Sequence, residues 1–507
     1  MLAALNKAKI KTSPLIPNLA NDYTGQTVVK IPAGDFTVRE LNGFLGRENM
    51  SMKIFGLKFV GAGLGLTKII FDPTDTAANV MLKNDYWLGL TFEGITFLTK
   101  KAGAIWMESH TTHNAQRYHF TDCEWKGPWK WVIDLQGDNN NSEFSFITCG
   151  TSNMQADGAF LRIGATNTSD QFLNYWFFGF KHWSTSAALI DAARGGHFHG
   201  IGVDVSDYGA AATATNPAYL FKLRGQNHSA GVQALTMHAL RVEAKHANSA
   251  LLYSEWASGN VNIECDWSSQ TPFFTYGDII YIDLGNTSGP IYNFHDSNLA
   301  GGIRIKYSTN AWQAQHHIEV SKSFWHQKLT PTEVVSYDRT SAGGNAIDPQ
   351  VIFNGVKPAA QTDVFSATGA AVWDATVSWN NGDLVKPLTK RTLNIHWPSG
   401  QLSDIFTNGM KIALPLGALI TAMTATAPAG NVTEGDGASW IIATTEASPA
   451  TVATVTVPGS RAAGYSIRTD LAIPYLCNTR EKATISYRST GASQGGSHAI
   501  VTIEGYW

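Results

Sequence analysis

The sequence contains little charge, no long basic run and no long apolar run. Only 15% of its 507 residues are charged, and the formal net charge is −3. Proteins whose main partner is nucleic acid are usually basic, so this class of function is disfavoured. No apolar run reaches the length of a membrane span, and we expect no membrane insertion. The N-terminus lacks a charged region followed by an apolar core, so no secretory signal peptide is expected.

Cysteine is also scarce. The chain has four cysteines and no CxxC or Cys/His spacing of the kind that holds zinc. We therefore expect no metal and no cofactor. Cys123, Cys149 and Cys265 end β-rich segments, at positions where a small apolar side chain would point inward. This placement predicts buried, reduced thiols.

The feature that is present throughout is a loose β-rich repeat with apolar residues at alternate positions. It returns every roughly 20–40 residues, a period typical of solenoids, propellers and arrays. The unequal spacing excludes a propeller, whose blades must keep one size to close a ring, and favours a parallel β-helix with loops of different lengths. Instances of the repeat are residues 52–60, 90–97, 118–123, 143–147, 198–205, 240–244, 261–265 and 291–296.

The texture of the sequence predicts an all-β chain in four parts. Residues 1–25 lead into the first coil, and residues 26–327 form the β-helix. Residues 328–388, richer in Pro, Gly and Ala, are predicted as terminal coils and a linker. Residues 389–507 have longer strands rich in Ala, Thr, Val and Ile, separated by Pro/Gly turns, which is typical of a β-sandwich.

Several of these segments resemble the tailspike depolymerases of bacteriophages, in particular those of phages that attack Acinetobacter. The resemblance extends over nearly the whole chain and is specific for the scaffold rather than for the chemistry. The segments that carry it are residues 31–38 (IPAGDFTV), 61–70 (GAGLGLTKII), 240–245 (LRVEAK), 251–256 (LLYSEW), 289–299 (GPIYNFHDSNL), 394–400 (NIHWPSG) and 414–417 (LPLG).

The resemblance implies a fold, an assembly and an activity. The expected fold is a right-handed parallel β-helix followed by a C-terminal β-sandwich, assembled as a homotrimer in the phage virion. The expected activity is cleavage of bacterial capsular polysaccharide or lipopolysaccharide. Family members usually carry an N-terminal domain that docks on the phage tail or baseplate. We expect that such a region is missing from this sequence.

Strand alternation predicts which side chains point outward. In residues 240–245 it places Arg241, Glu243 and Lys245 outward, and in residues 261–266 it places Glu264 outward. Aligning Val242 with Ile263 would stack Glu243 on Glu264 in neighbouring coils, with Asp204 as a third member of the column. Neighbouring coils lie about 4.8 Å apart. This is close to the carboxyl separation of retaining glycosidases, while alternate coils would fit inverting ones.

The predicted site therefore has a set of acids and a set of sugar-binding residues. The candidate catalytic residues are Glu243, Glu264, Glu255 and Asp204. The alternative for each carboxylate is a solvated or ion-paired surface group. Rings and cations near these acids would contact sugar, although core positions are an alternative for the tryptophans. These candidates are Arg241, Lys245, His246, Tyr253, Trp256, Trp176 and Trp183.

Three other functions compete with the hydrolase. A polysaccharide lyase would need a base and a cation, which Arg241, Lys245 and His246, or His197 and His199, would supply. A receptor-binding spike would use only the aromatic residues and would not cleave. A cellular pectin-type enzyme is disfavoured because it would normally carry a secretion signal.

Overall fold

The structure is a computed structural model, and it forms two compact units. Unit 1 comprises residues 1–336, 341–346 and 355–364, and unit 2 comprises residues 337–340, 347–354 and 365–507. The structure describes residues 27–40, 44, 54–84, 87–109, 116–136, 141–164, 173–184, 186–213, 215–224, 233–255, 259–269, 277–284, 291–295, 297–306, 316–321, 324–326, 335–338, 349–354, 357–358, 365–368, 377–380, 390–397, 412–413, 419–426, 438–444, 451–457, 466–476, 483–489 and 499–506.

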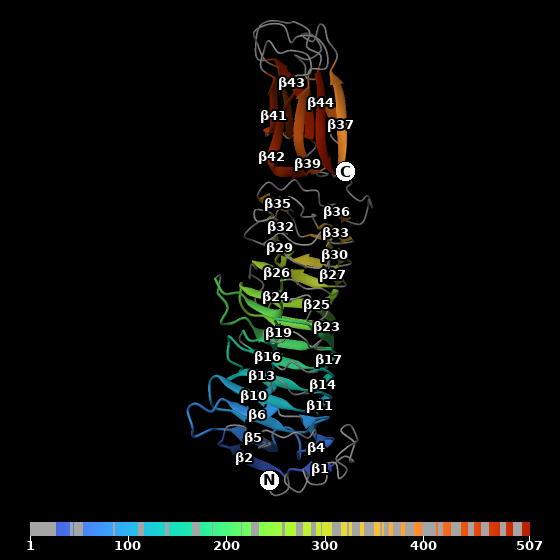
Figure 1. The fold of residues 1–507 in the computed structure, drawn as a ribbon. Coiled ribbons are helices and arrows are strands. Elements are labelled where there is room, and N and C mark those ends of the chain that lie inside the picture. Colours follow the sequence, from blue (N-terminus) through green and yellow to red (C-terminus); the bar gives the residue numbers. More distant parts are fainter. Residues whose placement is uncertain are drawn as a thin grey trace. The chain divides into compact units, whose positions relative to one another are not determined.

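Unit 1 is a parallel β-helix, as predicted (Figure 1). Each full coil contributes two short strands to a sheet that we call sheet A and one strand to a sheet that we call sheet C. Sheet C includes β6 (Val80–Asn84), β10 (Ala104–Ser109), β13 (Trp129–Leu135), β16 (Ala159–Ile163), β19 (Ala188–Ala192), β22 (Ala218–Leu223), β24 (Ser249–Glu255), β26 (Asp278–Asp283) and β29 (Gly302–Lys306).

Sheet A has two wings that meet at a corner in every coil. The first wing contains β1 (Thr27–Lys30), β4 (Leu57–Val60), β8 (Thr91–Glu93), β11 (Tyr118–Thr121), β14 (Phe144–Ile147), β17 (Tyr175–Phe178), β20 (His197–Ile201), β27 (Ile291–His295) and β30 (His317–Ser321). The second wing contains β2 (Gly34–Val38), β5 (Thr67–Phe71), β9 (Thr96–Thr99), β12 (Glu124–Lys126), β15 (Gly150–Ser152), β18 (Lys181–Trp183), β21 (Asp204–Tyr208), β28 (Asn298–Ala300) and β31 (Phe324–His326). Two longer strands, β23 (Ala234–Ala244) and β25 (Val261–Ser269), run through both wings. A small separate pair is β3 (Ile54–Phe55) with β7 (Trp87–Leu88).

In six consecutive coils the corner between the wings is made by one residue with a left-handed backbone. The N–H of such a residue bonds to a carbonyl one coil further on, for example Asp122 N to Ile147 O at 3.0 Å and Thr148 N to Phe178 O at 2.8 Å. Glycine adopts this backbone without steric cost, whereas other residues are strained there. The corner residues are Gly94, Asp122, Thr148, Gly179, Gly202 and Ala239, with φ between 48° and 64°.

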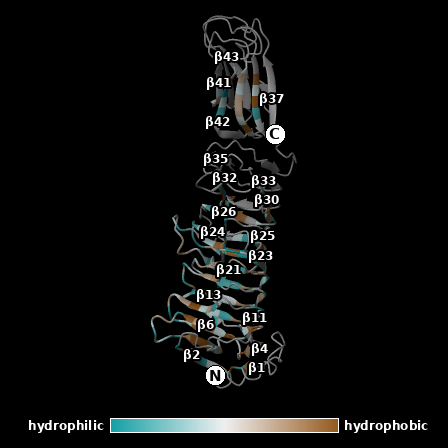
Figure 2. Cartoon of the chain, in the orientation of Figure 1, coloured by the Kyte–Doolittle hydropathy of each residue, from teal (hydrophilic) through white to brown (hydrophobic). Residues whose placement is uncertain are grey.

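The core of the β-helix is a column of stacked aromatic rings. Phe92 stacks on Phe120 with ring centroids 5.2 Å apart, and Phe120 stacks on Phe146 at 5.1 Å. Both stacks lie on inward positions of the first wing, and all three rings are fully buried. Figure 2 shows polar and apolar residues mixed along the coils of the β-helix. Alternation therefore produces one buried and one outward row per strand, because successive side chains point to opposite faces.

The cysteine prediction is confirmed for the three residues that the structure describes. Cys123, Cys149 and Cys265 are free and buried. Burial is the first cause of the raised pKa of the Cys123 thiol, and a hydrogen bond between Cys123 and Cys149 adds to it. The three thiols therefore pack as small apolar groups. Cys477 lies outside the described residues.

Unit 2 contains two four-stranded antiparallel sheets, in agreement with the predicted sandwich. One is β37 (Lys390–Trp397), β44 (Ala499–Tyr506), β39 (Leu419–Thr426) and β42 (Ser466–Leu476). The other is β38 (Ile412–Ala413), β43 (Ala483–Ser489), β40 (Ala438–Thr444) and β41 (Thr451–Val457). Met423 and Ile503 of the first sheet and Val455 of the second are buried. Besides these two sheets and the strands of the β-helix named above, the described residues form five further strands, of which β34 belongs to unit 1: β32 (Val335–Asp338), β33 (Gln350–Asn354), β34 (Lys357–Pro358), β35 (Phe365–Thr368) and β36 (Val377–Asn380).

The all-β class and the order of β-helix and sandwich are thus confirmed. The boundaries of the four predicted parts stay predictions, as does the homotrimer. The described residues contain no α-helix, and hence no helix that would be long and apolar enough to cross a membrane.

Candidate functional site

The predicted stacking of Glu243 on Glu264 is wrong. The structure pairs Val242 with Trp267 and Glu243 with Ser268. The predicted and observed registers differ by four residues, and alternation cannot separate them because any even shift keeps the same side chains outward. The corner decides the register instead. It aligns Ala239 with Gly202 of the preceding coil and leaves Glu264 at a bulge opposite His238.

Asp204 also stands outside the predicted column, because it pairs with Arg241 rather than with Glu243. Arg241 Nη1 donates to Asp204 Oδ1 at 2.9 Å, and Arg241 Nη2 donates to Glu243 Oε1. These hydrogen bonds, that of Glu243 first, raise the pKa of Arg241. One guanidinium is therefore ion-paired with two of the predicted catalytic carboxylates.

The neighbouring predicted residues form a second ion-paired group on the same wing. Lys245 pairs with Asp207, and the exposed Trp183 donates its indole N–H to the same carboxylate. The hydrogen bond from Lys245 is the first cause of the lowered pKa of Asp207. His246 lies just beyond this group and accepts a hydrogen bond from the backbone N–H of Asn248 at 3.2 Å. These side chains hold one another in place.

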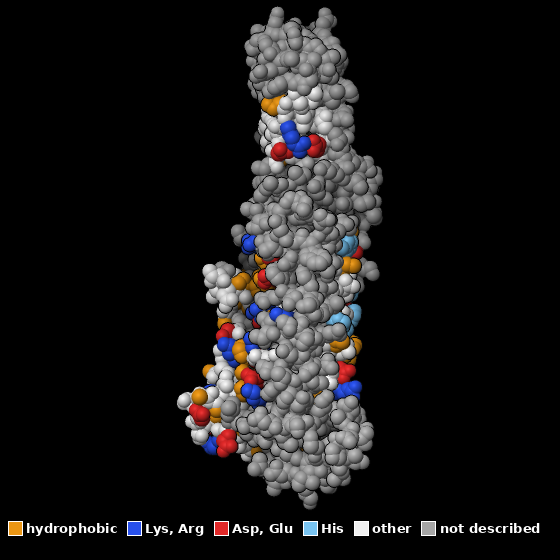
Figure 3. All heavy atoms as spheres, viewed as in Figure 1, with side chains coloured by type: hydrophobic (Ala, Val, Ile, Leu, Met, Phe, Trp, Pro, Cys, Tyr) orange, Lys and Arg blue, Asp and Glu red, His pale blue; other side chains and the backbone are white. Residues whose placement is uncertain are grey.

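Two further residues of the predicted site, Glu264 and Trp176, lie on the first wing. Glu264 Oε2 lies 3.5 Å from His238 Nδ1. Trp176 points outward and stacks on His199 with ring centroids 4.1 Å apart, and it lies parallel to Phe178. Figure 3 shows charged side chains of both signs and histidines on the face of the molecule in view. Trp256, the remaining predicted sugar-binding residue, lies outside the described residues.

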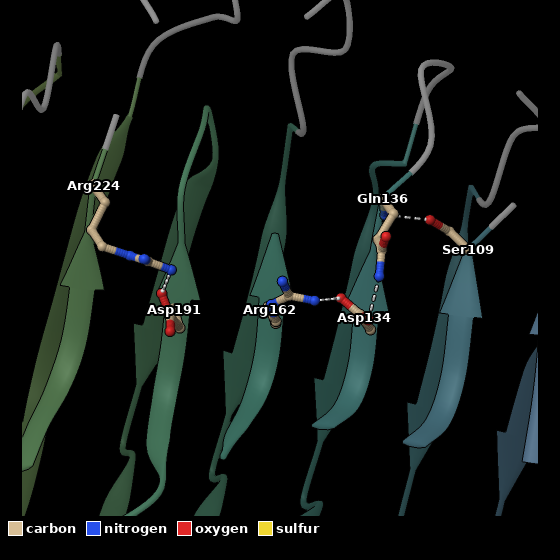
Figure 4. Close-up of polar contacts among 6 residues, drawn as sticks. All are labelled: Ser109, Asp134, Gln136, Arg162, Asp191 and Arg224. Atoms are coloured by element: carbon tan, nitrogen blue, oxygen red, sulfur yellow. Dashed lines mark hydrogen bonds and ion pairs between the residues drawn. The ribbon is translucent and has the colours of Figure 1, made fainter. Parts of the chain in front are cut away.

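Sheet C carries an outward row of polar side chains that sequence alternation did not single out. In register along the coils, this row consists of Lys83, Glu108, Asp134, Arg162, Asp191, Lys222, Tyr253, Tyr281 and Arg304. Figure 4 shows the central part of the row, where polar side chains of neighbouring strands point toward one another. Two pairs of carboxylates in adjacent coils belong to this face, and each is a candidate for acid–base chemistry.

The first pair is Glu108 with Asp134. Burial raises the pKa of Asp134 to about 6. The next-largest influence, the attraction of Arg162, acts in the opposite direction and lowers it. Its side chain has no exposed area, and both carboxylate oxygens are occupied. Arg162 Nη1 donates to Oδ1 at 2.9 Å and Gln136 Nε2 donates to Oδ2 at 2.7 Å (Figure 4). Because neighbouring side chains bind both of its oxygens, neither is free to exchange a proton with a sugar, and Asp134 is a structural group.

The second pair is Glu255 with Asp283, which are partners in the register of β24 and β26. Glu255 is half-buried, and Asp283 is buried with an exposed fraction of 3%. Tyr253 Oη donates to Glu255 Oε2 at 3.0 Å, the one hydrogen bond that the described residues give this carboxylate. Asp283 was missed in the sequence. A signal existed, because Tyr253-Ser-Glu255 recurs one coil later as Tyr281-Ile-Asp283.

A tyrosine surface adjoins this pair. The rings of Tyr253 and Tyr281 are parallel within 5°, with centroids 4.9 Å apart, and Tyr219 meets Tyr253 edge-on at 5.3 Å. All three rings are partly exposed on sheet C. A carboxylate pair beside outward tyrosine faces provides both a proton-transfer group and an apolar surface for a sugar ring. Among the described residues, no group of three or more His, Cys, Asp or Glu side chains is arranged to hold a metal ion.

Comparison with known proteins gives structural neighbours only. No protein-family model matches the chain. No curated protein matches it either. The catalytic domain of a GH87 alpha-1,3-glucanase, solved with nigerose, is 12% identical with a TM-score of 0.40, over 69% of this chain and 65% of that domain. The A-module of a mannuronan C-5 epimerase from Azotobacter vinelandii is 11% identical (TM-score 0.31), over 70% of this chain and 91% of that module. The tailspike protein of E. coli bacteriophage HK620 is 10% identical with a TM-score of 0.40, over 99% of this chain and 88% of that protein. The neighbours thus include a phage tailspike protein, an alpha-1,3-glucanase and a mannuronan epimerase.

Proposed function

We propose that this chain is a bacteriophage tailspike that binds a bacterial capsular or other surface polysaccharide and cleaves it by endo-glycoside hydrolysis. The observation that carries the proposal is the Glu255–Asp283 pair beside the stacked rings of Tyr253 and Tyr281. The tailspike assignment is supported by the sequence resemblance and by a β-helix followed by a unit of antiparallel sheets.

The geometry favours a retaining mechanism. Adjacent coils lie about 4.8 Å apart, close to the separation of about 5–5.5 Å between the two carboxyls of retaining glycosidases. Glu255 accepts the hydrogen bond from Tyr253 and is therefore the nucleophile, which bonds to the anomeric carbon. Asp283 gives its proton to the oxygen of the leaving sugar. Water then hydrolyses the glycosyl–Glu255 bond, and its proton returns to Asp283.

A lyase on the same scaffold is less well supported, because the possible bases are poorly suited. Burial, followed by the charge of Glu255, raises the pKa of Tyr253, so its phenolate is scarce at neutral pH. Arg241 and Lys245, the cations first considered for a lyase, are bound to carboxylates. His197 and His199 are uncharged at neutral pH because burial lowers their pKa, but they lie on sheet A, away from the tyrosines.

The assembly in this proposal is a homotrimer that belongs to the virion and acts at the host cell surface. Attachment to the phage tail is part of the same proposal. Outward apolar side chains on the first wing support contact with a second copy. Ile147, Phe178 and Ile201 are neighbours in register, and Ile147 and Ile201 are 40% and 49% exposed.

The test is digestion of capsular polysaccharides purified from a panel of encapsulated strains, followed by mass spectrometry of the products. We expect oligosaccharides that have gained one water per cut from one capsule type. Products with a double bond and no added water would replace the hydrolase by a lyase. A polysaccharide that the protein binds but leaves intact would make the chain a non-enzymatic receptor-binding spike.

A further inference from the structure

Lys222 occupies an unusual position in the outward row of sheet C. It is the neighbour in register of Asp191, whose carboxylate would be its natural partner. Asp191 instead pairs with Arg224 (Figure 4). Within the part of the chain that the structure describes, Lys222 makes no ion pair. Its ammonium group is therefore available to an anion from outside the chain.

Arg304 has the same property at the other end of the tyrosine surface. Its guanidinium lies over the ring of Tyr281, 5.9 Å from the ring centroid, and its side chain is exposed. No carboxylate of the described residues pairs with Arg304. Packing on an aromatic ring orients a guanidinium and leaves its N–H groups free to bind a carboxylate in bidentate fashion.

The other cations of this row are neutralised within the protein. Arg162 is bound to Asp134 at 2.9 Å, and Lys83 lies 3.4 Å from Glu108. The two unpaired cations are thus the pair that bracket the tyrosines, in the register Lys222, Tyr253, Tyr281, Arg304. Three coil spacings separate them, which is about 14 Å along the β-helix.

We infer that Lys222 and Arg304 bind carboxylates of an acidic polysaccharide, one built with uronic acids or other acid sugars, whose rings lie on Tyr253 and Tyr281. The inference rests on the proposed function and names its substrate class. Cations bind carboxylates through charge-assisted hydrogen bonds, and the tyrosine faces supply apolar contact with the sugar rings. A neutral polysaccharide would leave both cations without a partner.

Binding to purified capsular polysaccharides, sorted by composition into uronate-containing and neutral polymers, tests the inference. The dissociation constant is measured in the Glu255→Gln background, so that the polymer stays intact, and KM is measured with the wild-type protein. Lys222→Gln and Arg304→Gln are compared with Lys181→Gln, which removes an exposed cation from the second wing of sheet A. The uronate-containing polymer that binds most tightly is also tested after chemical reduction of its carboxylates to alcohols.

We expect each of the two variants to weaken binding of the acidic polymer roughly tenfold, because each loses a hydrogen bond to a charged group. Lys181→Gln should bind as the unmodified protein does. Reduction of the polymer should weaken binding and abolish the difference between variants. Unchanged binding in both variants, an equal loss on the reduced polymer, or preference for neutral polymers would overturn the inference.

The same data separate this inference from the hydrolase. Charge-dependent binding of a polymer that is never cleaved would overturn the hydrolase and leave the substrate class standing. Cleavage of a neutral polymer, with both variants unchanged, would leave the hydrolase standing and overturn the substrate class.

Discussion

On the second wing of sheet A the predicted catalytic carboxylates are ion-paired within the protein, whereas on the outward face of sheet C the Glu255–Asp283 pair lies beside tyrosines and cations that form no ion pair among the described residues. On the wing, Arg241 binds Asp204 and Glu243, and Lys245 binds Asp207. On sheet C, ion pairs occupy the early coils, and the tyrosines with Lys222 and Arg304 follow. A row of carboxylates is therefore a weak indicator of a site on a β-helix, because nearby side chains of the same or a neighbouring coil can supply counter-charges. The informative feature is the place where this pairing stops.

Removing one carboxylate from each face tests which face carries the activity. Glu255→Gln should lower kcat for polysaccharide cleavage roughly 10³-fold or more, because the nucleophile is lost while binding groups remain. Glu243→Gln should change kcat less than about fivefold, as expected for a surface ion pair. Single-turnover cleavage of the susceptible capsule, with polysaccharide binding measured in parallel, reports both effects.

Asp283→Asn is the matched variant within the proposed pair and should be as severe as Glu255→Gln. Full activity in Glu255→Gln, together with loss of activity in Glu243→Gln, would move the site to the wing of sheet A. It would also show that ion pairing of a carboxylate does not mean that the carboxylate is inactive.

A second prediction concerns the structural role of Asp134. Its pKa in the folded protein is about 6, against an ordinary value of 3.8, so the folded state holds the proton more tightly than the unfolded state. Between these two values the folded chain binds more protons, and the free energy of unfolding therefore falls as pH rises from about 4 to about 6. The difference of about two pH units corresponds to about 3 kcal/mol.

Thermal unfolding of Asp134→Asn and of the wild type at pH 4.5 and 7.5 measures this effect. The variant should gain stability relative to the wild type at the higher pH, since asparagine does not ionise. Asp35→Asn, which removes an exposed carboxylate from sheet A, is the control for loss of one negative charge. Identical pH dependence of Asp134→Asn and the wild type would show that Asp134 is not the perturbed group.

Alternation in the sequence was enough to predict the β-helix and the facing of individual side chains. Val242 is buried, and Arg241 and Glu243 point outward, as predicted. Alternation could not fix the register, because a period of two fits every even shift. The corner at Ala239 fixes it, and an alanine gives no sign of a left-handed backbone in a sequence.

The candidate site was predictable only in part for a related reason. Tyr253 and Glu255 were singled out, whereas Asp283 becomes visible when two coils are aligned on the repeated Tyr-X-acid pattern. The loss of charge pairing at Lys222 had no signal at all. It arises because Asp191 pairs with Arg224 rather than with Lys222, its neighbour in register, and side-chain geometry between coils decides which pair forms.

The smallest expected effect tests whether the pairing on the wing of sheet A contributes to stability. Arg241 is 46% exposed and its partners are partly exposed, so solvent screens both ion pairs. Arg241→Ala should lower the free energy of unfolding by no more than about 1 kcal/mol, and the loss should shrink as salt is raised.

The melting temperature in low and high salt checks this, with Arg162→Ala on sheet C as the contrasting variant. Arg162 serves a carboxylate that is fully buried, so its removal should cost more and depend less on salt. If Arg241→Ala proved the more damaging of the two, the charges of the wing would hold the coils together. The ion pairs of sheet C would then be dispensable for stability, and the contrast drawn between the two faces would be wrong.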